Sequence, residues 1–180
     1  MLIVFTGNGK GKTSAALGTA LRASGWEKRV AIIQFIKGNK EVGEWKLLQK
    51  ISNIEIHQFF DNYKLDITEK EITDIKSKEY KDSCQKAWEF AKETILNGKH
   101  DLIVLDEINN ALNYGLLDKK EILEFIRDYS DENSDSDSDI ILTGRNAPAE
   151  MIEIANLVTE MKEIKHPFQK GISAKEGIDY

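Results

Sequence analysis

The hydrophobic residues of this chain gather in short runs that are separated by polar segments with helical spacing. Three of the runs, at residues 30–35, 101–106 and 139–144, are apolar throughout and do not alternate with polar residues. Continuous apolar runs of this length are typical of parallel strands that are covered on both faces. The strands are predicted at residues 2–6, 30–35, 54–59, 101–106, 139–144 and 157–164. We therefore expect an α/β fold with a mainly parallel sheet of about six strands and helices on both faces.

The clearest helical segment lies between the third and fourth of these runs. It carries one apolar stripe that follows i, i+3, i+4, i+7 and i+11 spacing, which predicts a helix packed on the sheet. The sequence Asn97-Gly98 is a stop signal for this helix, and Pro148 suits the first turn of another. The region 60–83 is rich in charged residues, and we expect a helix to begin there near Thr68. The stripe consists of Cys84, Ala87, Trp88, Ala91 and Ile95.

Length and composition indicate one globular domain over residues 1–180. The 180 residues are 41% hydrophobic and 31% charged, and no apolar run approaches the roughly 18 residues of a membrane span. The chain passes from Met1 directly into a strand-like run without the regions of a secretory signal, so we expect a cytoplasmic protein. A single cysteine excludes an internal disulfide, and the three histidines lack the spacing of zinc ligands.

The net charge of −6 is concentrated in one acidic segment, residues 131–139. The rest of the chain is close to neutral, so we expect neither a nucleic-acid-binding surface nor a basic membrane-binding face. Asp135, Asp137 and Asp139 match the start of a calcium-binding loop, but that loop requires glycine where Ile140 stands and glutamate where Asn146 stands. A solvated loop is the better interpretation.

The sequence TGNGKGKTS, residues 6–14, has the composition of a phosphate-binding loop between a strand and a helix. Its glycines allow backbone amides to approach an anion, and the following helix presents its positive end. The match to G-x-x-x-x-G-K-[ST] is imperfect because Thr6 occupies the first glycine position and Lys10 adds a cation. Lys12 is expected to contact phosphate oxygens. We predict ATP binding by Gly7, Asn8, Gly9, Lys10, Gly11, Lys12, Thr13 and Ser14.

A second motif, LIVLDE at residues 102–107, resembles the strand that ends in a magnesium-binding acid in P-loop proteins. Parallel strands bring their carboxyl ends to one rim, which would place residues 34–37 and 143–145 beside this acidic pair. We expect Thr13, Asp106 and Glu107 to form a Mg²⁺ site. An acidic pair at the end of a strand can also be a merely solvated edge.

These general motifs leave the reaction open. In one interpretation Glu107 orients water against the terminal phosphorus, and the protein is an ATPase or kinase. In another the whole triphosphate is a leaving group and the attack falls elsewhere on the nucleotide. A nucleotide-dependent binding module without turnover is a third alternative.

The wider sequence resembles the P-loop corrinoid adenosyltransferases, in blocks that run in order from residue 6 to residue 180. The resemblance implies a RecA-like P-loop NTPase fold and a homodimer. It also implies transfer of the 5′-deoxyadenosyl group of ATP to the cobalt of cob(I)alamin or a cobyrinic acid derivative, with release of triphosphate and with a reductase or other electron donor as partner. The blocks are TGNGKGKTSAALGTALRASG, VAIIQFIKG, LIVLDEINNALNYGLL, ILTGRNAP, LVTEMKEIKHPF and KGISAKEGIDY.

In such a reaction Lys10, Lys12 and Arg145, together with Mg²⁺, would stabilise the departing triphosphate. The predicted catalytic residues are therefore these three cations and Glu107. Asn109 and Asn110 could hydrogen-bond the substrate or cap the following helix. The resemblance implies that the tail, residues 165–180, folds over the site.

The chain departs from the family in the segment expected to contact the corrinoid. Many members have a Gly-Phe-x-Trp stretch after the third strand, whose aromatic residues are implied to displace the lower ligand of cobalt. Phe59-Phe60-Asp61-Asn62-Tyr63 stands there in this chain. Phe60 and Tyr63 could perform the same task, although an aromatic residue after a strand also suits the core.

Overall fold

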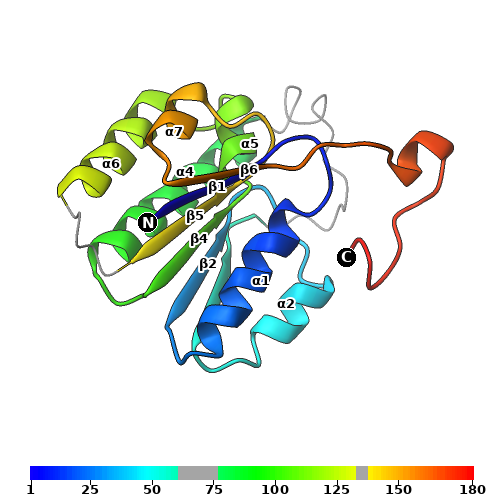
Figure 1. The fold of residues 1–180 in the computed structure, drawn as a ribbon, viewed down its shortest axis with the longest axis horizontal. Coiled ribbons are helices and arrows are strands. Elements are labelled where there is room, and N and C mark those ends of the chain that lie inside the picture. Colours follow the sequence, from blue (N-terminus) through cyan, green and yellow to red (C-terminus); the bar gives the residue numbers. More distant parts are fainter. Residues whose placement is uncertain (61–76, 133–137) are drawn as a thin grey trace.

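The computed structural model describes residues 1–60, 77–132 and 138–180 (Figure 1). Within these ranges six strands form one all-parallel sheet, which confirms the predicted α/β architecture. The strand order is β3-β2-β4-β5-β1-β6. The strands are β1 Leu2–Thr6, β2 Val30–Gln34, β3 Ile54–Gln58, β4 Leu102–Asp106, β5 Asp139–Thr143 and β6 Leu157–Glu160.

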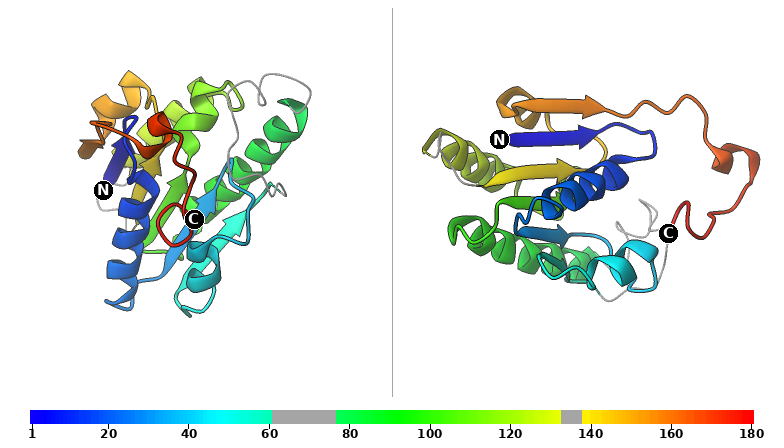
Figure 2. Two further views of the ribbon diagram at one scale, coloured as in Figure 1. Left: turned by 90° about the vertical axis from the view of Figure 1, so that its right-hand side faces the viewer. Right: turned by 60° about the horizontal axis from the view of Figure 1, so that its bottom comes forward.

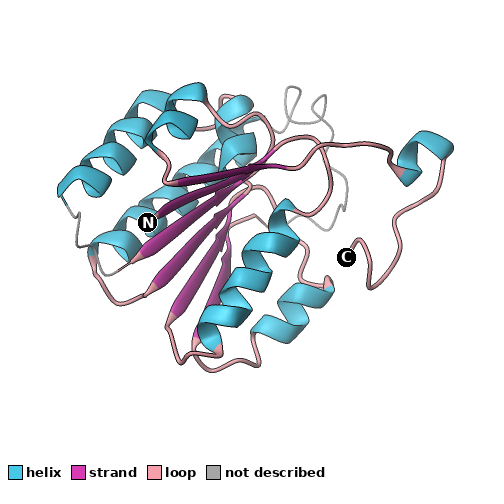
Figure 3. Ribbon diagram, viewed as in Figure 1, coloured by secondary structure: helices cyan, strands magenta, loops and turns pink. Residues whose placement is uncertain are grey.

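Helices cover both faces of the sheet (Figures 2 and 3). On one face lie α1 Lys12–Ser24 and α2 Gly43–Leu48. The other face is covered by α4 Ser77–Leu96, α5 Ile108–Asn113, α6 Lys119–Glu132 and α7 Ala149–Ile154. The tail contains a short 3₁₀ helix, η1 Pro167–Lys170. In the described ranges no helix combines the length and apolarity needed to cross a lipid bilayer.

The apolar stripe predicted for the helix before β4 is confirmed. Its five residues in α4 are between 0% and 1% exposed, and they pack against the inner face of β2 and β4. Strands β2 and β4 are buried along their whole length, as their continuous apolar sequences predicted. The predicted helix start near Thr68 and the acids at positions 135 and 137 lie outside the described residues.

The sixth strand is shorter than its apolar sequence predicted, because it ends at Glu160 and does not reach residue 164. The Met161 amide still donates to Thr6 O at 2.8 Å, but the Met161 carbonyl accepts from the Gly9 amide at 2.6 Å. The chain after β6 therefore follows the loop after β1 out of the sheet.

The strand order brings the carboxyl ends of β2, β4, β5 and β1 to one rim. Gln34, Asp106, Thr143 and Thr6 are the last residues of these strands. In open parallel sheets this rim is where ligands bind. The loop that precedes α1 begins at the same rim.

Candidate functional site

The loop between β1 and α1 wraps around the ammonium group of its own lysine. Lys12 is 8% exposed, and its Nζ donates to Gly7 O and Gly9 O at 2.8 Å each. Burial lowers the pKa of Lys12, and the neighbouring Glu107 carboxylate counteracts part of this effect. The helix starts at Lys12, so its first-turn amides face the mouth of the loop and can bind an anion.

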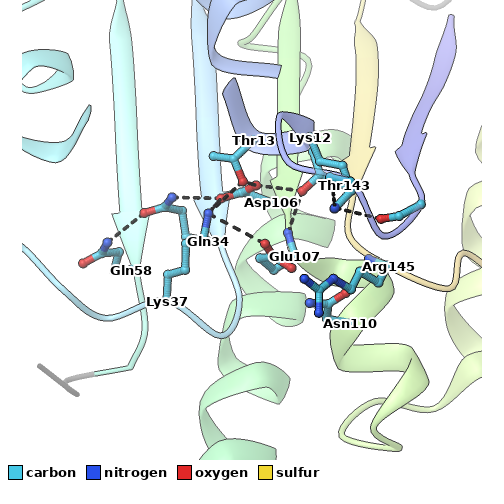
Figure 4. A network of polar contacts seen from close by, with 12 residues as sticks. Lys12, Thr13, Gln34, Lys37, Gln58, Asp106, Glu107, Asn110, Thr143 and Arg145 are labelled. Carbon is cyan, nitrogen blue, oxygen red and sulfur yellow. Dashed lines mark hydrogen bonds and ion pairs between the residues drawn. The ribbon is translucent and has the colours of Figure 1, made fainter. Parts of the chain in front are cut away.

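A hydrogen-bond network fixes Asp106 at the end of β4 (Figure 4). The side chain is 0% exposed. Its Oδ1 accepts from Thr13 Oγ1 at 2.9 Å and from Thr143 Oγ1 at 2.7 Å. Its Oδ2 accepts from Gln34 Nε2 and from Lys37 Nζ, both at 2.9 Å. Asp106 therefore ties α1 to three neighbouring strand ends.

The charges of Asp106 and Lys37 stabilise each other. Burial by itself would raise the pKa of Asp106, but the Lys37 ammonium and the donated hydrogen bonds bring it below its ordinary value. Burial would likewise lower the pKa of Lys37, but the two acids beside it raise the pKa above its ordinary value. The pair is therefore a carboxylate and an ammonium in the folded protein.

Glu107 differs from its neighbour in both backbone and side chain. It adopts a left-handed conformation with φ 65°, which is uncommon outside glycine and is often found at functional sites. Its amide donates to Thr143 Oγ1 at 2.9 Å. Its Oε2 is buried and accepts no hydrogen bond from the described residues. Burial raises the pKa of Glu107, so this carboxylate is poised to gain a cationic or hydrogen-bonding ligand.

The loop after β5 places Arg145 on the opposite side of Glu107 from Lys37 (Figure 4). Arg145 is exposed, and its amide donates to Asn110 Oδ1. Neither Asn109 nor Asn110 caps α5, whose N-cap is Glu107. Asn110 thus holds the Arg145 loop, whereas Asn109 is buried and its amide group has no hydrogen-bond partner among the described residues.

Lys12, Thr13, Lys37 and Glu107 line a pocket of about 430 Å³, a volume within the range of small-molecule sites. The end of the tail closes one side of it, and Lys10 forms an ion pair with Asp179 there. Arg145 and the buried Asp106 do not line the pocket. Its lining comprises Lys10, Gly11, Lys12, Thr13, Ser14, Leu17, Lys37, Gly43, Glu44, Glu107, Gly177, Ile178, Asp179 and Tyr180.

The donor atoms in and directly behind the pocket wall fit Mg²⁺. The Thr13 hydroxyl, the Asp106 carboxylate and Glu107 Oε2, which has no hydrogen-bond partner among the described residues, are all oxygen donors, which this ion prefers. Thr13 Oγ1 and Asp106 Oδ1 are already 2.9 Å apart. Two of the three predicted ligands are therefore in contact and the third follows directly in sequence, while Mg²⁺ binding stays a prediction.

Phe60, one of the two aromatic residues predicted to contact a corrinoid, is not among the residues that line this pocket. Phe60 is 7% exposed and its ring stacks on Tyr80, with centroids 4.2 Å apart, in the core beneath α4. Tyr63 lies outside the described residues. Contact between either residue and a corrinoid stays a prediction.

Sequence reasoning placed Lys37 at the rim but gave it no role. It also missed Gln58, whose Nε2 donates to Gln34 Oε1 at 2.7 Å and so orients the amide that binds Asp106. The available signal was the position of both residues at or just after strand ends. Their roles depend on β2 lying between β3 and β4.

Substitution of Gly9 tests the close contact between this loop and the chain after β6. An added Cβ would lie 2.7 Å from Met161 O and 2.9 Å from Lys162 O. We expect Gly9→Ala to lower the free energy of unfolding by roughly 1–3 kcal/mol through this overpacking, and to weaken ATP binding. Chemical denaturation and calorimetric titration with ATP measure both effects.

Gly18→Ala is the matched control, because an added Cβ there meets nothing within 4 Å and the position is inside α1. That variant should be stabilised by roughly 0.5–1 kcal/mol and should bind ATP as the wild type does. Equal stability of Gly9→Ala and the wild type would contradict the close packing of Gly9 against Met161 and Lys162.

Comparisons with known proteins match the whole chain to one family. The model of the family ATP:corrinoid adenosyltransferase BtuR/CobO/CobP matches residues 1–180. The chain is 38% identical over 183 residues to a corrinoid adenosyltransferase of Sinorhizobium sp, covering 100% of this chain and 80% of that protein. It is 34% identical over 180 residues to the corrinoid adenosyltransferase of Escherichia coli (strain K12), covering 100% and 85%. Against corrinoid adenosyltransferase CobA of Salmonella typhimurium the identity is 33% over 180 residues, again covering 100% and 85%.

Proposed function

The chain belongs to the ATP:corrinoid adenosyltransferase family and is an enzyme that adenosylates corrinoids with ATP, and we propose that its pocket directs the attack to the 5′ carbon. The cobalt of a cob(I) corrinoid donates its electron pair to that carbon. The bond between the 5′ carbon and the adjacent phosphate oxygen breaks, and its electron pair leaves on triphosphate. The products are an adenosylcorrinoid with a cobalt–carbon bond and free triphosphate.

The observation that carries this proposal is the cluster of cations in one pocket. Lys10, Lys12 and Lys37 all line it, beside the first turn of α1. A reduced corrinoid is itself a strong nucleophile, so the protein needs no base to activate it. It has to orient the nucleotide and stabilise the negative charge that develops on a departing triphosphate. A cluster of lysines at a helix amino end suits that task.

We assign separate roles to the residues around the phosphates. Lys12, held by the loop carbonyls, contacts the phosphates from within the loop. Lys10 exchanges its partner Asp179 for a phosphate oxygen. Arg145 approaches from beyond Glu107, where its guanidinium adds positive charge near the breaking bond. The remaining residues of the segment 7–14 contribute backbone amides and hydroxyl groups to the nucleotide.

Thr13 and Glu107 are the residues that would hold Mg²⁺, with Asp106 in support. When bound, this ion neutralises part of the charge on the triphosphate. Two observations support this assignment. The Thr13 hydroxyl is hydrogen-bonded to the buried Asp106 carboxylate, and Oε2 of the adjacent Glu107 has no hydrogen-bond partner among the described residues. The hydrogen bonds around Asp106 hold its carboxylate beside the Thr13 hydroxyl before the nucleotide arrives.

We also propose that the enzyme acts as a cytoplasmic homodimer and takes a corrinoid reduced by a separate electron donor. The feature that favours self-association is the edge strand β6, whose four residues are all exposed. Leu157 is 42% exposed and Val158 38% exposed. Ile164 and Phe168, in the chain after β6, are exposed as well. Apolar side chains at an exposed sheet edge favour burial against a second copy.

The proposed reaction is tested by identifying both products. The enzyme is mixed with ATP, Mg²⁺ and chemically reduced cobalamin without oxygen, the absorbance of the cobalt–carbon bond is followed, and the phosphate product is identified by ³¹P NMR. We expect adenosylcobalamin and triphosphate in equal amounts. ADP without a cobalt–carbon bond would mean that Glu107 directs water to the terminal phosphorus, as in an ATPase.

A further inference from the structure

Lys37 contacts the residues whose oxygen atoms are assigned to Mg²⁺ (Figure 4). It stands three residues after the end of β2 and reaches across to β4. Its Nζ donates to Thr13 Oγ1 at 2.8 Å and to Asp106 Oδ2 at 2.9 Å, and it lies 3.8 Å from Glu107 Oε1. One ammonium group thus contacts all three residues of the metal set.

A divalent cation and this ammonium compete for the Thr13 hydroxyl and the Asp106 carboxylate. Mg²⁺ binds oxygen at about 2.0–2.1 Å, so a cation shared by Thr13 and Asp106 overlaps the place where the lysine nitrogen now lies. Two positive charges in contact are strongly repulsive in a partly buried site. Binding of the metal therefore requires Lys37 to move.

The pocket offers Lys37 a second position. Its side chain is 33% exposed, and it lines the pocket together with Lys10 and Lys12. A lysine has a flexible stem and a compact charge, so it can turn from a carboxylate to a phosphate at little cost. The phosphates of a nucleotide in this pocket would supply the oxygen atoms that Lys37 loses.

We propose that Lys37 is a tethered cation that occupies the metal position in the nucleotide-free enzyme and transfers to the nucleotide phosphates when Mg²⁺ enters with ATP. It is a positioning residue in the free enzyme, because it keeps two adjacent acids and the Thr13 hydroxyl together. It also excludes free Mg²⁺, so that the metal is taken up with the nucleotide. The inference rests on the metal site of the proposed function.

The test measures Mg²⁺ binding without nucleotide and without corrinoid. The proteins are the wild type, Lys37→Met, Lys37→Arg and the control Lys28→Met. The control removes a 58% exposed lysine two residues before β2, at the end of the strand opposite Lys37. Lys28 pairs only loosely with Asp101, at 3.6 Å, so its loss should change little. Calorimetric titration with MgCl₂ gives the affinity, and thermal unfolding with and without MgCl₂ gives the change in Tm.

We expect Lys37→Met to bind Mg²⁺ roughly tenfold or more tightly than the wild type, since a competing charge about 3–4 Å from the acids is gone. Its metal-free Tm should fall, and Mg²⁺ should restore it. Lys37→Arg and Lys28→Met should show neither effect. A residue with only a structural role would lower the Tm without creating a metal-dependent recovery.

Equal or weaker Mg²⁺ binding by Lys37→Met would overturn the proposal. If that variant does not fold, the wild type still decides the question. It should bind MgCl₂ only weakly without nucleotide, and tight binding would contradict the exclusion of free Mg²⁺ by Lys37. None of these measurements involves adenosyl transfer, so the inference and the proposed reaction can fail independently.

Discussion

Replacing Lys12 by alanine is expected to reduce the rate constant for adenosyl transfer by roughly 10²- to 10³-fold, the usual effect of losing one charged contact in a transition state. Lys12 is the most enclosed cation of the pocket, 8% exposed and hydrogen-bonded to Gly7 O and Gly9 O. Its charge lies where the phosphates of the nucleotide should bind.

The loop should keep its fold without this side chain. The Gly9 amide remains bonded to Met161 O, and α1 retains its buried face of Ala16, Leu17 and Ala20. Circular dichroism and thermal unfolding should therefore be close to those of the wild type. Single-turnover measurement of the cobalt–carbon bond isolates the chemical step from product release.

Lys46→Ala serves as the control for a lysine removed nearby. It lies in α2, is 57% exposed and pairs with the exposed Glu41, so transfer should proceed at the wild-type rate. Wild-type turnover by Lys12→Ala would show that the phosphates do not lie in the loop. That result would also remove the basis for the roles given to Lys10 and Arg145.

The fold could be predicted from sequence because its strands carry an unambiguous signal. The runs around Ile32, Val104 and Ile141 are buried on both faces of the sheet, and such burial demands continuous apolar sequence. The edge strand β6 is the exception. It was predicted too long because its residues are exposed, so no requirement for burial marks where pairing stops.

Only the parts of the site that belong to recognisable sequence motifs could be assigned a role from the sequence. The loop residues and the acidic pair were found because glycine spacing and the end of a strand have direct chemical meaning. Residues 34–37 were placed at the same rim, but their individual contacts with Asp106 were not predicted, since Gln34 and Lys37 reach it only because β2 and β4 are neighbours. Strand order is a property of the whole sheet, and no local spacing encodes it.

Replacing Asp106 by asparagine is the second change with a large expected effect, because it affects both the proposed metal site and the stability of the fold. Asparagine keeps the shape but removes the charge that Lys37 and the two threonine hydroxyls contact. Hydrogen bonds to a charged group contribute about 1.5–3 kcal/mol each. We expect the free energy of unfolding at neutral pH to fall by roughly that amount, and transfer to fall by at least about 10²-fold.

The pH dependence of stability distinguishes the loss of the Asp106 charge from a simple packing defect. Burial by itself would raise the pKa of Asp106. In the folded protein Lys37 and the donated hydrogen bonds outweigh burial and bring the pKa below its ordinary value. Its contribution is therefore complete above the unfolded-state pKa and is lost as the pH falls through the lower folded-state pKa. The variant has no such group, so the difference in unfolding free energy between the two proteins should shrink on acidification.

Asp101→Asn is the control at the opposite end of β4. Asp101 is 23% exposed and accepts from the Arg29 amide at 2.7 Å, far from the rim that carries the pocket. Its loss should cost about 1 kcal/mol or less and leave transfer unchanged. Urea denaturation over a range of pH, with single-turnover transfer at neutral pH, compares the three proteins. If Asp106→Asn matched Asp101→Asn in both measurements, the network at the end of β4 would be neither a source of stability nor part of the metal site.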